Sequence, residues 1–176
     1  MSRGKWKNLR GVWTRVRLMH VSRFGAMAST IKFYSVGDPF GEFSNFAAFA
    51  IRLKKRVWPT TEHYFQAQKF VGTDDGHAEA IRRATSPMMA ARMGRDRKKR
   101  LRRDWESVKV GVMREALVAK FEQHAELREL LLSTGDAKLV EHTERDDYWG
   151  DGGDGSGRNM LGQLLMEGRR RMAGDS

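Results

Sequence analysis

The sequence predicts a single domain that is mainly helical and has a few short strands. The chain has 176 residues, 40% of them hydrophobic and 31% charged, which is enough for one domain with a sizeable core. Helix start signals followed by helical apolar spacing recur from Trp58 to the end of the chain. Alternating runs typical of strands are short and lie between Ile31 and Trp58.

The composition excludes several kinds of chemistry. Because the chain has no cysteine, it has no disulfide, no thiolate metal site and no cysteine nucleophile. No apolar run approaches the roughly 20 residues that span a bilayer, so we expect a soluble, cytoplasmic protein. His63 and His77 have no partner at metal-ligand spacing. We therefore expect neither a metal nor a redox cofactor.

The net charge of +11 is unevenly distributed. Seven basic residues and no acid lie in residues 1–29, which leaves +4 for the rest of the chain. We expect residues 1–29 to be a basic extension. It fits a disordered arm, an Arg-rich targeting segment, or translated upstream sequence with the functional start at Met27. The remainder is too weakly basic to require a large phosphate-binding surface, but a local patch can hold one phosphate.

Residues 31–36 alternate in polarity and predict a short strand, which Gly37-Asp38-Pro39 ends. Residues 40–46 contain three phenylalanines around Ser44 and Asn45, a composition typical of a loop that is buried but polar at its tip. The Asn45 amide can donate and accept towards a ligand, or it can satisfy its own backbone. Residues 49–53 and 57–58 predict a hairpin that turns at residues 54–56.

The stretch from Trp58 to Lys69 predicts a helix with Glu62 in its first turn. Pro59 disfavours helix at Trp58, and a threonine that follows can cap the freed N–H groups. At about 100° per residue, Glu62, Gln66 and Lys69 share one arc. This arc fits either a pocket wall or a solvated face whose glutamate complements the helix dipole.

Further helices are predicted over residues 77–84, 86–94, 104–123, 126–133 and 160–172. A dense basic run from Arg92 to Arg103 leads into the helix that begins at Asp104. Trp105, at that helix entrance, fits the core, or it can stack on a base whose phosphate lies among the nearby cations.

Residues 136–141 begin a further short element, and residues 139–150 are dense in carboxylates and aromatic rings. The glycine-rich loop at 151–159 lacks the ending of a phosphate-binding loop and the oxygen ligands of a calcium loop. Its backbone either binds an anion at the next helix N-terminus or forms a close turn.

Seven segments carry a resemblance to a known family. They are Phe43-Ser44-Asn45-Phe46; Trp58-Pro59-Thr60 with residues 62–69; Ser86-Pro87 with residues 90–94; residues 104–109; Lys120-Phe121; Asp146 with Trp149-Gly150; and residues 157–162. In this order, the segments make residues 31–172 closely similar to the NADAR family. Residues 1–29 have no counterpart, which agrees with an extension, so we expect the domain to cover residues 30–174.

The resemblance implies an N-glycosidase, a hydrolase of N-glycosyl compounds, with an α+β, mainly helical fold. The catalytic glutamate, tryptophan and aspartate of the family fall on Glu62, Trp105 and Asp146. Asn45, Lys69, Lys109 and Asn159 match other pocket positions. We expect Arg92 and Trp149 to contact the substrate as well.

Breaking a glycosidic bond requires carboxylates near C1′, because the transition state is oxocarbenium-like and the attacking water must lose a proton. We expect one of Glu62 and Asp146 to activate or position the water, and the other to stabilise the ribosyl cation or to protonate the leaving nitrogen. We expect Trp105 to stack on the base and Lys69, Lys109 or Arg92 to hold a phosphate. The expected substrate is a phosphorylated ribosylamine of riboflavin biosynthesis or ADP-ribosylated guanine. A non-enzymatic nucleotide-binding module is the alternative from another class. No obligate protein partner is indicated.

Overall fold

The computed structural model describes residues 29–174, so nearly all of the predicted basic extension lies outside the described residues. The described part is α+β and mainly helical, which confirms the predicted fold class. In chain order, it contains β1 (Thr30–Phe33), the 3₁₀ helix η1 (Gly41–Phe43), β2 (Ile51–Leu53), β3 (Arg56–Trp58), α1 (Thr61–Gln68), α2 (Asp75–Arg82), α3 (Pro87–Gly94), α4 (Trp105–Gln123), α5 (Ala125–Ser133), β4 (Lys138–Glu141) and α6 (Met160–Ala173).

Side-chain caps start three of the helices, as their sequences indicate. The oxygens of Thr60, Asp74 and Ser86 each accept a hydrogen bond from a backbone N–H in the first turn of α1, α2 and α3, respectively. Asp104 precedes α4 but makes no capping hydrogen bond. Its carboxylate instead pairs with the Arg102 guanidinium at 2.6 and 2.9 Å. The helix begins where predicted, but Asp104 does not cap it.

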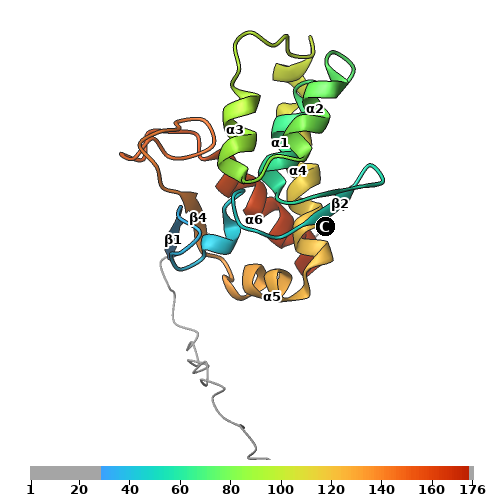
Figure 1. Cartoon of the computed structure of the whole chain (residues 1–176). Helices are drawn as coiled ribbons and strands as arrows, with labels where there is room; N and C mark the ends of the chain where they lie inside the picture. Colours follow the sequence, from blue (N-terminus) through green and yellow to red (C-terminus); the bar gives the residue numbers. More distant parts are fainter. Residues whose placement is uncertain (1–28, 175–176) are drawn as a thin grey trace, which may run out of the picture.

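The strands form two separate pairs. β2 and β3 make the predicted hairpin, with Lys54 and Lys55 at its turn at φ angles of 51° and 61°; Arg56, predicted in the turn, belongs to β3. β1 pairs in parallel with β4, so that Phe33 lies opposite Glu141. A parallel pair needs a long crossover, and here that crossover contains α1 to α5 (Figure 1). This pairing joins the two ends of the domain.

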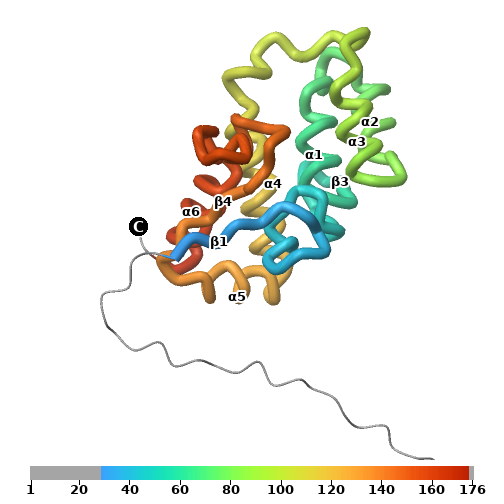
Figure 2. Tube along the Cα trace, turned by 90° about the vertical axis from the view of Figure 1, so that its left-hand side faces the viewer, coloured from blue at the N-terminus to red at the C-terminus, as the bar shows by residue number. Residues whose placement is uncertain are grey.

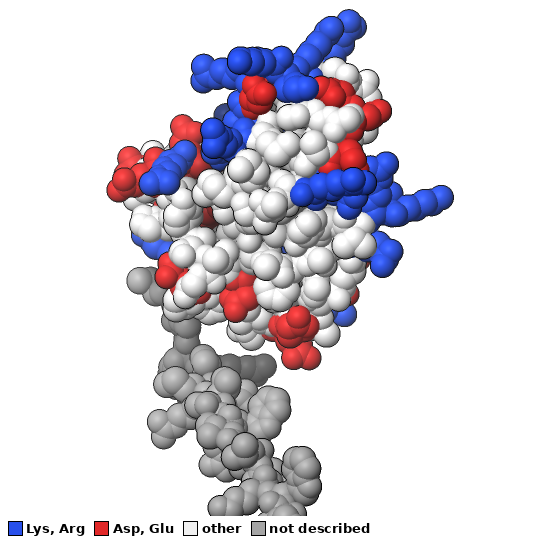
Figure 3. All heavy atoms as spheres, viewed as in Figure 1, with Lys and Arg blue, Asp and Glu red and all other residues white. Residues whose placement is uncertain are grey.

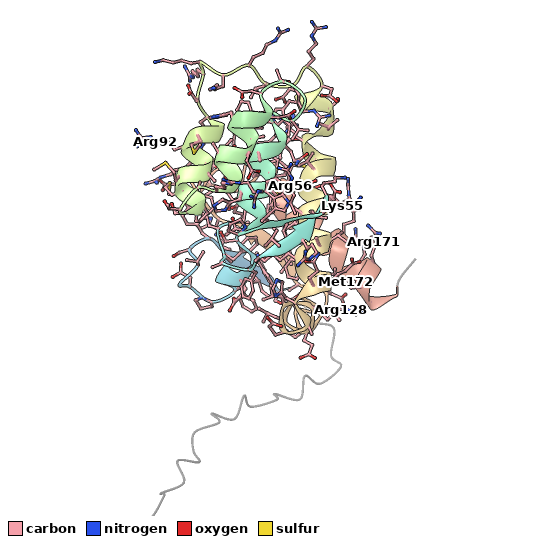
Figure 4. All side chains as sticks on the ribbon, turned by 45° about the vertical axis from the view of Figure 1, so that its right-hand side comes forward. Lys55, Arg56, Arg92, Arg128, Arg171 and Met172 are labelled. Atoms are coloured by element: carbon pink, nitrogen blue, oxygen red, sulfur yellow. The ribbon has the colours of Figure 1, made fainter. Side chains whose placement is uncertain are left out.

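Helix α1 lies at the centre of the domain. All eight of its residues are buried, and it packs against α2, α3 and α4. Figure 2 shows α4 between the group formed by α1, α2 and α3 and the group formed by β4 and α6. Side chains on α1 are therefore held from several directions. At the base of the domain, α5 and α6 are joined by a hydrogen bond that Arg128 donates to the Met172 carbonyl at 3.2 Å (Figure 4).

None of the helices described between residues 29 and 174 has the length and apolar character required to cross a membrane.

Candidate active site

Glu62 lies in the first turn of α1 and is only 6% exposed. Pro59 disfavours helix at Trp58, and the Thr60 cap then starts the helix one residue before Glu62. The Glu62 backbone N–H donates to the Asn45 carbonyl at 3.2 Å, which ties the loop containing Asn45 to the helix start. The polar arc of α1 is therefore buried, and the interpretation as a solvated face is wrong.

The Glu62 carboxyl has charged neighbours of both signs. Gln66 Nε2 donates a hydrogen bond to Glu62 Oε1 at 2.7 Å. Burial raises the pKa of Glu62, and the negative charge of Asp146 raises it further. The hydrogen bond from Gln66 and the positive charges of Lys69 and Arg95 act in the opposite direction without cancelling the effect of burial. The pKa of this one carboxyl is thus influenced by groups from α1, from the loop after β4 and from the basic run.

The end of α3 fits closely against this part of α1. A Cβ atom at Gly94 would overlap the side-chain amide of Gln66, so only glycine allows this approach. Lys69 Nζ donates to the Gly94 carbonyl at 3.2 Å. Within the described structure, Gln66 Oε1 is buried without a hydrogen-bond partner. Gly94 therefore ends α3, as predicted, and also gives room to the amide that contacts Glu62.

Asp146 lies in the loop that follows β4 and is fixed by its own neighbours. Its Oδ1 accepts hydrogen bonds from the backbone N–H groups of Tyr148, at 2.9 Å, and Trp149, at 2.7 Å. Gly150 sits so tightly that a Cβ atom there would come within 2.9 Å of the carbonyl oxygens of both Asp146 and Glu141. The loop thus folds back on the end of β4 and holds Asp146 beside it.

Asp151 stabilises the same loop and was not singled out from the sequence. Its Oδ1 accepts the N–H groups of Thr143, at 3.1 Å, and Gly153, at 3.0 Å. Its Oδ2 shares a hydrogen bond of 2.8 Å with His142 Nδ1. These contacts give the glycine-rich loop a close-turn structure organised by one buried carboxylate.

Glu141 is a further carboxyl at the site that sequence reasoning missed. It is the last residue of β4, and its N–H donates to Asn159 Oδ1 at 2.9 Å. Burial, together with the negative charges of Asp146, Glu62 and Asp151, raises the pKa of Glu141 to about 8. The sequence signals were its place in the carboxylate-rich stretch at residues 139–150 and its position after the apolar pair at residues 139–140, and neither distinguished Glu141 from the other acids of that stretch.

Aromatic rings form a connected group beside the carboxyls. Phe65 packs edge-to-face against Trp105, with centroids 5.0 Å apart, and against Trp149 at 5.2 Å. Trp149 in turn contacts Tyr148 at 5.2 Å. Trp105 is only 6% exposed, whereas Tyr148 and Trp149 are partly exposed. The structure brings both predicted tryptophans to the site, and Trp149 presents the larger accessible surface.

Two predicted lysines lie against this aromatic group. Lys69 Nζ is 5.7 Å from the centre of the Phe65 ring and 5.8 Å from that of Trp105, and burial lowers the pKa of Lys69. Lys109 Nζ lies 4.0 Å from the centre of the Tyr148 ring. Each lysine therefore lies beside an aromatic face, and the Lys109 ammonium also pairs with the Glu106 carboxylate at 2.6 Å.

Arg92 is placed differently from the other predicted cations. It is exposed, and Figure 4 shows its side chain on the outer side of α3, pointing away from the helices. Arg95, three residues later, acts on the Glu62 carboxyl. Contact of Arg92 with the substrate stays a prediction, and the member of the basic run that lowers the pKa of Glu62 is Arg95.

The two predicted asparagines lie at the site, and both contact the protein itself. Asn45 Oδ1 accepts a hydrogen bond from Thr61 Oγ1 at 3.2 Å. Asn159 begins α6 in the left-handed conformation, with φ of 51°. Its Oδ1 accepts from Glu141 N and its Nδ2 donates to the Leu139 carbonyl at 2.8 Å. Contact of these amides with substrate stays a prediction, and their observed contacts fix α1 and β4.

A large surface hollow lies elsewhere. It encloses about 1030 Å³ between the β2–β3 hairpin and α2, where Glu79 pairs with Arg82 and Arg83, and no predicted site residue lines it. Across residues 29–174, histidine, aspartate and glutamate side chains form no group arranged to hold a metal ion. The arrangement that supports chemistry is therefore the carboxyl and aromatic cluster around Glu62.

Comparison with known proteins places this arrangement in context. A family model described as the NADAR domain matches residues 32–173. The chain is 62% identical to the N-glycosidase YbiA of Escherichia coli K12 over 157 residues, which cover 89% of this chain and 94% of that protein. The NMR structure of E. coli YbiA matches with a TM-score of 0.78 and 63% identity over 89% of this chain and 90% of that one. The chain is also 44% identical to the chloroplastic riboflavin biosynthesis protein PYRR of Zea mays, over 82% of this chain and 25% of that protein.

Proposed function

Because this chain belongs to the NADAR family and is an N-glycosidase, a hydrolase acting on N-glycosyl compounds, we propose that its substrates are phosphorylated ribosylamine intermediates of riboflavin biosynthesis. The maize relative, named a riboflavin biosynthesis protein, supports this substrate class. So does the site itself, which combines acids for glycosidic chemistry with lysines that can hold a phosphate. The products are the free pyrimidine amine and ribose phosphate.

The observation that carries the proposal is the pair of carboxyl groups that two different elements bring to one site. Glu62 comes from α1 and Asp146 from the loop after β4, and the charge of Asp146 raises the pKa of Glu62. An oxocarbenium-like transition state needs negative charge near C1′ together with a group that takes a proton from the attacking water. Two carboxyl groups facing one site supply both functions.

We assign the direct contacts with the sugar to Glu62 and Asp146. Asp146 Oδ1 accepts two backbone N–H groups, which orients the carboxylate and leaves its second oxygen for the sugar or the water. Glu62 is fixed by the first turn of a buried helix and by Gln66. One of these carboxyls activates or positions the water, and the other stabilises the ribosyl cation.

The aromatic group and the cations bind the remainder of the substrate in this proposal. Trp105 or Trp149 stacks on the pyrimidine, and the greater exposure of Trp149 favours that ring as the platform. Lys69 and Lys109 hold the phosphate as charge-assisted partners. Arg92 reaches the substrate only at the rim of the site, because it is exposed on α3.

One observation favours a second candidate substrate, ADP-ribosylated guanine in nucleic acid. Residues 95–103 form a loop with exposed Arg95, Arg97, Lys98, Arg100 and Arg103, and Figure 3 shows lysine and arginine gathered at that edge of the molecule. Arg95 at one end of the loop acts on Glu62. A basic loop that begins at the site and continues over the surface suits a substrate with several phosphates.

Product formation separates the two substrates. The protein is incubated with a phosphorylated pyrimidine ribosylamine and, separately, with DNA that carries ADP-ribosylated guanine. We expect release of free base and ribose phosphate from the first. Release of ADP-ribose from the second, with no cleavage of the first, would overturn the proposed substrate class in favour of the nucleic-acid candidate.

A further inference from the structure

Four carboxyl groups meet at this site, and three of them receive hydrogen bonds from donors. Glu62 receives one from Gln66, and Asp146 receives two from backbone N–H groups. Asp151 receives two backbone N–H groups and shares a third hydrogen bond with His142. A donor directed at a carboxyl oxygen favours the ionised form of that carboxyl. Glu62, Asp146 and Asp151 are each compensated in this way.

Glu141 is the exception among the four. In the described structure its carboxyl accepts no hydrogen bond from the protein and forms no ion pair, and the residue is only partly exposed to solvent. Its backbone is fixed on both sides, because its N–H donates to Asn159 Oδ1 and its carbonyl accepts from Asp151 N at 2.9 Å. The side chain is therefore held at the site without any group that stabilises its negative charge.

The charges that act on Glu141 all have the same sign. They belong to Asp146, Glu62 and Asp151, and each of them raises the pKa of Glu141. The positive charges of Lys69 and Arg95 lower the pKa of Glu62 and do not contribute to that of Glu141. When carboxyl groups crowd together, they do not all ionise, and the proton stays on the least compensated member. Burial also raises the pKa of Glu62, but Gln66, Lys69 and Arg95 offset part of that rise, whereas no group offsets the rise at Glu141. By this criterion the proton belongs on Glu141.

We propose that Glu141 is the general acid of the reaction and donates its proton to the nitrogen that leaves C1′. This assignment rests on the proposed function, since it concerns cleavage of a ribosylamine. In this step the C1′–N bond breaks and its electron pair goes to the nitrogen, which takes the proton of Glu141. Water adds to C1′ and gives a proton to Asp146 or Glu62. That proton then returns to Glu141, so the site is reset and the net reaction consumes one water.

Infrared spectroscopy tests the protonation state without any substrate. We expect the difference spectrum between wild type and Glu141→Gln at pH 7 to contain the carbonyl band of a protonated carboxyl group. The matched control is Glu144→Gln, which removes an exposed acid from the same loop and should show no such band. Absence of the band from the Glu141→Gln difference spectrum, in a folded variant, would overturn the proposal.

Kinetics test the role of that proton. General acid catalysis contributes about 10²–10⁴-fold, so Glu141→Gln should lower kcat/KM on the phosphoribosylamine by about 10²-fold or more. On p-nitrophenyl ribofuranoside 5-phosphate, whose nitrophenolate leaves without a proton, the loss should be only a few-fold. The wild-type rate on the ribosylamine should also fall as the pH rises above about 8, and the variant should lack this decline. Equal losses on both substrates, or an unchanged pH profile, would make Glu141 a structural residue and overturn the proposal.

The choice of substrate distinguishes a failure of this proposal from a failure of the proposed function. If the wild type cleaves only ADP-ribosylated guanine, the proposed substrate class fails. The Glu141 comparison is then made between ADP-ribosylated guanine and an aryl ADP-ribose, where the same selective loss supports the general acid and an equal loss contradicts it.

Discussion

The two sides of the site are built in different ways. The helix side, residues 61–69, holds Glu62 by helix geometry, with an amide and cations as neighbours. The loop side, residues 141–159, holds Asp146 by short-range hydrogen bonds and close-packed glycines, with carboxyl groups as neighbours. We infer that the helix side compensates negative charge, whereas the loop side concentrates it. Substitutions on the two sides should therefore differ in their effects.

The largest effect is expected from neutralising the loop side at Asp146. Asp146→Asn keeps an oxygen that accepts the N–H groups of Tyr148 and Trp149, so the loop should stay folded. Loss of the carboxylate should lower kcat/KM by about 10²–10⁴-fold, measured as release of ribose phosphate. The control is Asp147→Asn, at an exposed neighbouring position. Activity within a few-fold of wild type would show that the loop side is not catalytic.

On the helix side, Gly94→Ala is expected to have a smaller effect on activity and also to lower stability. The new methyl group would displace Gln66 from Glu62, so both activity and stability should fall. We expect a loss of about 1–3 kcal/mol in the free energy of unfolding by urea titration, and about a 10-fold loss in kcat/KM, on the order of one hydrogen bond.

Gly111→Ala in α4 is the matched control, because nothing lies within 4 Å of a Cβ atom there. This substitution should leave activity unchanged and raise stability by about 0.5–1 kcal/mol, as expected for alanine in a helix. Equal effects of the two substitutions would contradict the packing argument for Gly94.

These contrasts also explain what could be predicted from the sequence. The starts of α1 and α3 are local events, since a cap and the residues that follow it lie within one turn, and the residues around Thr60 and Ser86 indicate both starts. The type of β4 was not predicted, because it depends on pairing with β1 more than 100 residues away.

The same reasoning applies to the site. Glu62 and Asp146 were identified from motifs, and the spacing of Gln66 and Lys69 followed from helix geometry. Glu141 was missed because its proximity to Glu62 arises only from the tertiary fold. Arg95 was not singled out because periodicity does not fix side-chain direction where α3 ends and the loop begins.

A smaller effect is expected at the cations. Lys109→Met should raise KM by about 10-fold with little change in kcat, since a charge-assisted hydrogen bond to a phosphate is worth about 1.5–3 kcal/mol at most and Lys109 is partly solvated. The exposed Lys98→Met is the control and should change neither constant. A fall in kcat with KM unchanged would place Lys109 in the chemical step instead.

A pH-dependent effect on stability is expected from removing the uncompensated acid. The pKa of Glu141 is about 8 in the folded protein and 4.5 when unperturbed, so the folded state binds the proton more tightly. Its contribution to stability is fully present below pH 4.5 and is lost as the pH rises through 8. Glu141→Gln should therefore raise the thermal midpoint relative to wild type by a few degrees or more at pH 9, with little difference at pH 5. A thermal midpoint below that of wild type at pH 9 would contradict this sign.

The most direct test of the account is turnover of a phosphorylated pyrimidine ribosylamine by Glu62→Gln. The glutamine retains the shape of the side chain and an oxygen that can accept the hydrogen bond from Gln66, so circular dichroism and the thermal midpoint should match a folded protein. Release of ribose phosphate should fall by about 10²-fold or more. A folded Glu62→Gln variant with full turnover would contradict the central claim that catalysis depends on the carboxyl held by α1.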